Sequence, residues 1–218
     1  MKFKLTIPTS LSEITLHQYQ KYSKAIKEEE NNVQFHNMKA VEVFCGVRIN
    51  DVRAIRAKDY EEILKDIANV FQSQTPFENR FELDGQEFGF IPDLDDMTLG
   101  EYIDLETYLG DVELWHKAMA VMYRPVTNKR GDKYIIEPYE TANNYADMMR
   151  YSSLDIFMGS QVFFYNLGKD LVKHTLTSSK ATVEMQLLME ALNQNGVGTG
   201  VFMHWLEEGF PHLGMSLN

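Results

Sequence analysis

The chain has 218 residues, of which 44% are hydrophobic and 24% are charged, and its formal net charge is −11. These fractions are typical of a folded globular protein and exclude a disordered one. The single cysteine, Cys45, excludes an intramolecular disulfide and a cysteine zinc site. A surface with this excess of acids repels phosphate backbones, so nucleic acid is not an expected partner.

No segment predicts a membrane partner. Residues 1–8 alternate polar and apolar side chains, unlike the continuous apolar region of a signal peptide. The densest apolar stretch, residues 156–167, is interrupted by Ser160, Gln161 and Asn166 and is too short to cross a bilayer. We therefore expect a protein that stays in the cytoplasm or in a particle assembled there.

The first part of the chain predicts a short strand and three helices. Residues 2–7 alternate and are followed by a proline, which indicates an edge strand. Thr15 and Gln18 have the spacing of a capping box, so a helix should begin at Leu16 and end near residue 29. Two further helices are expected over residues 36–45, ending at Gly46, and over the amphipathic segment 58–72.

The second part predicts two hairpins and further helices. Asp84 and Gly85 form a strong hairpin signal, because both residues tolerate the positive φ of a type I′ turn. Thr98 and Glu101 repeat the capping box, and Gly110 should end their helix. A second hairpin is expected between residues 125–127 and 134–136, across a basic tip at 128–133. Helices are expected over residues 112–123, 143–151, 154–174, 184–193 and 200–208.

The helix expected over residues 154–174 is apolar on almost all sides. Its large apolar residues include Leu154, Phe157, Val162 and Leu171. A helix of this kind is buried, either in the protein's own core or in a contact with another subunit.

The two parts resemble each other. Residues 11–19 match 94–102, residues 39–45 match 117–123, and residues 59–64 resemble 144–149, in the same order along the chain. Leu and Tyr recur at the same spacing after both capping boxes, and we expect them to anchor each helix to the next. The alternative is that capping boxes and apolar helices recur by chance.

From this repeat we predict an α+β, mostly helical fold. It consists of two pseudo-symmetric strand–helix–helix–helix units with short hairpins, followed by a C-terminal helical extension. The first unit spans residues 1–78, the second, with the β-hairpins, spans 79–175, and the C-terminal helical arm spans 176–218.

The sequence predicts no catalytic residue, metal ligand or cofactor site. Glu113 and His116 have the Glu-x-x-His spacing of a di-iron bundle, which needs this pair twice, and no second copy exists. Asp93, Asp95 and Asp96 precede a helix, where acids favour the helix dipole, and they lack the spacing of a calcium loop. The alternative hypothesis is a small metal-dependent enzyme with a site near Glu113 and His116.

Two apolar stripes near the C-terminus are the predicted partner-binding residues. Either they pack on the protein's own core, or they belong to an arm, hinged at the glycines of residues 196–200, that lays its apolar face into a groove on another subunit. The predicted contact residues are Met185, Leu188, Met189, Leu192, Phe202, Trp205, Leu206 and Phe210.

Three runs resemble a family of small proteins encoded by tailed bacteriophages. They are residues 88–105 (FGFIPDLDDMTLGEYIDL), 116–125 (HKAMAVMYRP) and 162–168 (VFFYNLG), and the resemblance spans about residues 5–175. It implies a non-enzymatic virion protein, or an assembly chaperone, of the tail or baseplate. The expected partners are other phage structural proteins or further copies of the chain, with no small-molecule substrate. The expected location is the host cytoplasm during assembly, or the virion.

Overall fold

The computed structural model describes residues 5–27, 29, 31–94 and 96–163. These residues form the mixed α+β, mostly helical fold that the sequence predicts. The C-terminal arm predicted over residues 176–218 lies outside the described residues, as does the part of the helix 154–174 beyond residue 163.

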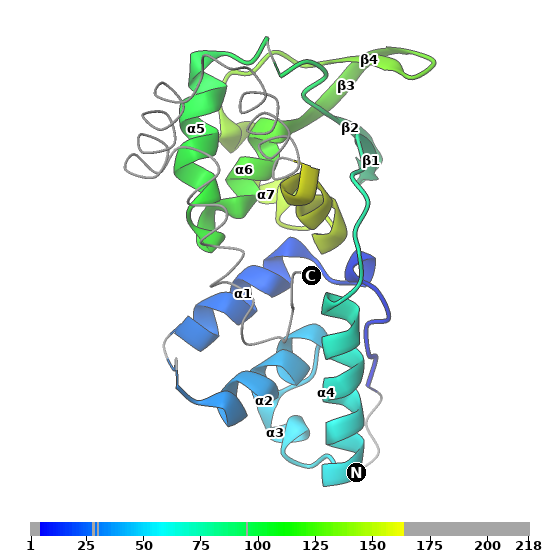
Figure 1. Cartoon of the computed structure of the whole chain (residues 1–218), viewed down its shortest axis with the longest axis vertical. Coiled ribbons are helices and arrows are strands. Elements are labelled where there is room, and N and C mark those ends of the chain that lie inside the picture. Colours follow the sequence, from blue (N-terminus) through cyan, green and yellow to red (C-terminus); the bar gives the residue numbers. More distant parts are fainter. Residues whose placement is uncertain (1–4, 28, 30, 95, 164–218) are drawn as a thin grey trace, which may run out of the picture.

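Residues of the first unit form a group of helices at one end of the molecule (Figure 1). Helix α2 packs against the three others. The elements are the 3₁₀ turn η1 (Leu11–Glu13) and helices α1 (Leu16–Lys27), α2 (Val33–Phe44), α3 (Ile49–Val52) and α4 (Ala57–Phe71).

Local sequence signals explain most of these helices. The capping box of α1 is present, since the Thr15 N–H donates to Gln18 Oε1 at 2.9 Å and the Gln18 N–H donates to Thr15 Oγ1 at 3.2 Å. Gly46, with φ of 64°, follows the end of α2. Helix α4 buries the predicted apolar face, including Ile63, Ile67 and Phe71.

The edge strand predicted over residues 2–7 is wrong for residues 5–7. They have no regular secondary structure, and Leu5 and Ile7 pack against the helical core instead. The sheet lies at the other end of the molecule (Figure 1), so an extended segment here has no strand beside it to complete its hydrogen bonds.

The sheet of the described residues has four antiparallel strands in the order β1-β2-β3-β4. Asp84 and Gly85 turn the first hairpin with φ of 51° and 77°, as predicted. The second hairpin is longer than predicted, because Arg130 pairs with Lys133 and the turn consists of Gly131 and Asp132. The strands are β1 (Arg80–Leu83), β2 (Gln86–Phe90), β3 (Tyr123–Arg130) and β4 (Lys133–Ile136).

Helices of the second unit cover the inner end of the sheet. Helix α6 packs against both α5 and α7. The elements are α5 (Leu99–Leu109), η2 (Val112–Leu114), α6 (Trp115–Met122), η3 (Ala142–Asn144) and α7 (Ala146–Met149), followed by a helical segment over residues 154–163.

The helix predicted over residues 143–151 is shorter than expected. Helix α7 ends at Met149, because residues 150–154 run beside the start of α1. The N–H groups of Leu16 and His17 donate to the carbonyls of Ser152 and Arg150 at 2.9 and 2.7 Å. The N–H of Leu154 returns a bond to the carbonyl of Ile14 at 2.7 Å. This segment therefore links the two units through their backbones.

Aromatic side chains join the same two units. The fully buried Trp115 ring stacks on Tyr19 of α1 at 5.5 Å between centroids and on Phe157 of the helical segment 154–163 at 4.4 Å. A Cβ on Gly159 would lie 2.3 Å from the carbonyl oxygen of Pro76, so only glycine permits this approach. Of the two predicted alternatives for this helix, Leu154 and Phe157 show burial in the protein's own core, whereas Val162 is 44% exposed, contrary to the prediction.

Candidate functional site

The structure separates the two residues of the predicted metal-site hypothesis. Glu113 accepts a hydrogen bond from Lys24 Nζ at 3.1 Å on the surface. His116 is buried, and its ring nitrogens contact the Arg150 guanidinium at 2.9 Å and the Gln20 amide at 3.1 Å. The side chains of Glu113 and His116 therefore serve different contacts.

His116 is held neutral. Burial, together with the positive charges of Arg150 and Lys117, lowers its pKa to about 4. Because the Arg150 guanidinium can only donate, Nε2 of His116 accepts its hydrogen bond. The residue thus acts as a polar link between α1, α6 and the segment after α7.

Other candidate metal or nucleophile sites are equally engaged in the fold. Across residues 5–27, 29, 31–94 and 96–163, no three His, Cys, Asp or Glu side chains are placed to share a metal ion. Burial raises the pKa of Cys45 to about 11, so its thiol stays protonated. Of the acidic cluster, Asp95 lies outside the described residues.

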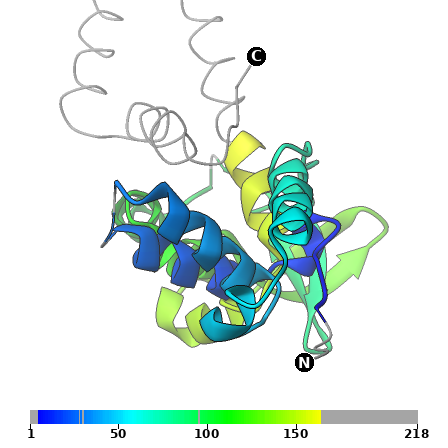
Figure 2. The ribbon, with the colours of Figure 1, turned by 90° about the horizontal axis from the view of Figure 1, so that it is seen from below.

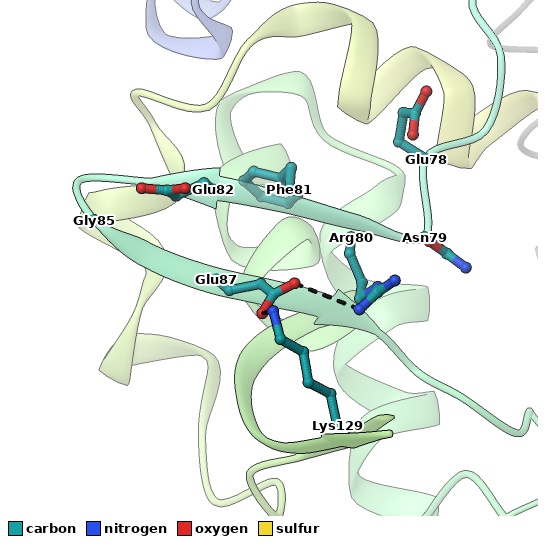
Figure 3. Close-up of a pocket in the computed structure, with 8 residues that line it drawn as sticks. All are labelled: Glu78, Asn79, Arg80, Phe81, Glu82, Gly85, Glu87 and Lys129. Carbon is teal, nitrogen blue, oxygen red and sulfur yellow. Dashed lines mark hydrogen bonds and ion pairs between the residues drawn. The ribbon is translucent and has the colours of Figure 1, made fainter. Parts of the chain in front are cut away.

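An open groove of about 500 Å³ lies beside the first hairpin (Figure 3). Glu87 on β2 accepts from Lys129 of β3 at 2.6 Å and lies 3.5 Å from Arg80 of β1. Figure 3 shows Glu78 and Glu82 pointing away from this cluster. Because the Glu87 carboxylate on β2 contacts a cation on each neighbouring strand, the cluster has the geometry of a cross-strand link.

The exposed apolar surface of α5 is the most distinctive feature of the second unit. Leu99, Tyr102 and Ile103 are 74%, 40% and 50% exposed. Their spacing of three and four residues places them on one side of the helix, and we call these three residues the α5 face. The expectation that Leu99 and Tyr102 anchor α5 to the next helix is wrong.

The matching residues of α1 are buried. Leu16, Tyr19 and Gln20 correspond to Leu99, Tyr102 and Ile103 in the repeat, and they are 0%, 3% and 6% exposed. The second unit covers them, since Tyr19 stacks on Trp115 and the Gln20 amide donates to the Val112 carbonyl at 2.7 Å. The α5 face has no such cover among the described residues.

Acidic residues surround the α5 face. Residues 93–111 contain seven acids and no lysine or arginine. Glu101 turns inward to the Arg124 guanidinium, and Asp104 accepts from the Tyr139 hydroxyl. Glu106 is exposed and interacts electrostatically with Tyr102, and Asp96, three residues before Leu99, is exposed as well. The α5 face therefore fits an apolar surface with positive charges at its edge.

The sequence contained a signal for this face, namely the spacing of Leu99, Tyr102 and Ile103, but the pattern alone does not distinguish a core face from a docking face. The residues predicted to bind partners, Met185 to Phe210, lie outside the described residues.

The fold and the α5 face together define a mixed α+β protein with an exposed apolar helix face in an acidic segment. No protein-family model, curated protein or solved structure matches the chain. None of the helices in the described part of the chain is long and apolar enough to cross a membrane.

Proposed function

We propose that the protein is a non-enzymatic structural or assembly protein of a tailed bacteriophage. It acts in tail or baseplate morphogenesis by binding other phage structural proteins, in the host cytoplasm or as part of the virion. The observation that supports this proposal most directly is the exposed α5 face, because the same positions of α1 are buried against a neighbouring unit.

The free energy that burial of the α5 face would contribute favours its use as a contact surface. Burying a large apolar side chain contributes about 1.5–3 kcal/mol, so three such residues on one helix face supply a useful share of a binding energy. Apolar residues at this spacing are the anchors by which helix faces and grooves recognise each other. The C-terminal stripes from Met185 to Phe210 provide a second contact in this proposal.

Capture from infected cells tests the proposal. Tagged full-length chain should retain phage tail or baseplate proteins, and the double variant Leu99→Asp with Ile103→Asp should retain at least about tenfold less. Val33→Asp is a matched control, since Val33 is 66% exposed on α2 and lies outside the α5 face. A wild-type chain that captures no phage structural protein would contradict the proposal.

A further inference from the structure

We propose that the partner of the α5 face is a second copy of this chain, bound through the tip of its β3–β4 hairpin. Copies then assemble head to tail. The inference rests on the proposed function in one respect, namely that the α5 face is a contact surface.

The hairpin tip carries the positive charges that the α5 face lacks. Arg130 and Lys133 pair across the turn and are both exposed. Lys129 is engaged by Glu87 at 2.6 Å, so Arg130 and Lys133 are the cations left for a partner. Ile135 lies two residues beyond Lys133 on the same side of β4 and is 62% exposed. The tip thus combines an excess of positive charge, since Arg130 and Lys133 outnumber the exposed Asp132 of the turn, with one large apolar side chain.

The hairpin tip and the α5 face are complementary in charge and in apolar character. Ile135 of one copy matches the apolar α5 face, and Arg130 and Lys133 match the exposed Glu106 next to Tyr102. A symmetric contact between two α5 faces would place the acids of both copies near each other, which costs free energy. Charge therefore favours the hairpin tip over a second α5 face as the occupant.

The arrangement of the fold permits this contact only between copies. In both views the hairpin projects from the body of the molecule, and α5 lies on the opposite side of the second unit (Figures 1 and 2). One chain cannot bring its own tip to its own α5 face. Each bound copy leaves one tip and one face open, so the contact generates rings or filaments. A tip of a few residues forms a small interface, so each contact is weak.

Sedimentation velocity of the full-length chain over a concentration series tests the inference. We expect self-association that weakens at least about tenfold when salt rises from about 50 to about 500 mM, because ion pairs between exposed groups are screened. Glu106→Lys and Lys133→Glu should each weaken it at least about tenfold, and the double variant should return to within about threefold of wild type.

Lys58→Glu is the matched control, because Lys58 is an exposed cation of α4, and this change should leave self-association unaltered. A chain that stays monomeric up to about 200 μM overturns the inference, since weak interfaces associate in that range. A double variant as weak as the single variants also overturns it. If the wild-type chain is monomeric but Leu99→Asp still loses phage proteins, the inference fails and the proposed function stands. If self-association follows the charge swaps but no phage protein is captured, the inference stands and the proposed function fails.

Discussion

Helices α1 and α5 begin with the same capping box but complete it differently. In the first unit, the Gln18 amide accepts from Thr15 and also donates from Nε2 to the Val43 carbonyl at 3.1 Å, near the end of α2. In the second unit, Glu101 accepts from Thr98 and has no hydrogen to donate. Arg124 supplies the missing donor. Its guanidinium donates to Glu101 and, at 3.2 Å, to the Val121 carbonyl near the end of α6.

Val43 and Val121 occupy the same position in the matched blocks 39–45 and 117–123. The repeat therefore extends from the sequence to a specific link between the start of one helix and the end of the next. A single neutral amide makes the link in the first unit, and a buried ion pair makes it in the second. The inner contacts are alike, while the outer faces differ, since that of α1 is buried and that of α5 is open.

The largest expected effect comes from the contact that covers α1. Trp115→Ala removes the ring between Tyr19 and Phe157 and should lower the free energy of unfolding by about 4 kcal/mol, measured by urea denaturation. Tyr151→Ala is the control, since Tyr151 is 64% exposed and its loss should cost less than about 0.5 kcal/mol. Equal losses in the two variants would mean that Trp115 does not hold the units together.

The next largest loss of stability tests the two forms of the link between helices, namely the neutral amide of Gln18 and the ion pair of Glu101 with Arg124. Arg124→Leu leaves Glu101 buried without its cation and should cost about 3 kcal/mol in the free energy of unfolding. Adding Glu101→Gln gives the second unit the amide of the first, which can cap Thr98 and donate to Val121 by itself. The double variant should therefore recover at least about half of the loss. If it is no more stable than Arg124→Leu, the two links are not equivalent.

A smaller effect comes from His116 and depends on pH. Its pKa is about 4 in the folded chain and near the ordinary value of 6.5 when unfolded. Between these values the unfolded state binds a proton that the native state does not, so stability falls as pH drops from about 6.5 towards 4. His116→Gln removes this proton uptake and should flatten the fall by about 2 kcal/mol, measured by urea denaturation across that range.

Glu101 also contributes to the pH dependence of stability, in the wild-type chain and in His116→Gln alike. Burial alone would raise the pKa of Glu101, but hydrogen bonds from Thr98 and Arg124 outweigh it and hold the pKa below its usual value. Its contribution to stability is present above the ordinary carboxyl pKa and is lost as pH falls further. Because Glu101 is unchanged in His116→Gln, the difference between the two curves isolates the histidine. Parallel curves would contradict the assignment of a neutral, buried His116.

The sequence predicted the elements that depend on local chemistry. Capping boxes at Thr15 and Thr98 and the Asp84-Gly85 turn involve residues within four positions of each other, so their physics is contained in short segments. The mixed α+β class followed from these signals. The pairing of β2 with β3, which joins Phe88 to Pro125, depends on segments far apart in the chain and left no local pattern.

The candidate site was harder to predict for the same reason. Leu16 and Leu99 have similar neighbours in sequence, yet one is fully buried and the other is 74% exposed. The difference arises because Trp115 and Ser152 of the second unit cover α1, while no described segment covers α5 in the same way. Helical periodicity identifies an apolar face but not what lies against it.

The most direct test of the account compares Leu16→Ala with Leu99→Ala by urea denaturation of the full-length chain. Leu16→Ala should lower the free energy of unfolding by about 3 kcal/mol, because it leaves a cavity in the core between the units. Leu99→Ala should change it by less than about 0.5 kcal/mol, because its side chain is 74% exposed and contributes little to the fold. A loss at Leu99 as large as the loss at Leu16 would show that the α5 face belongs to the protein's own core and would contradict the account.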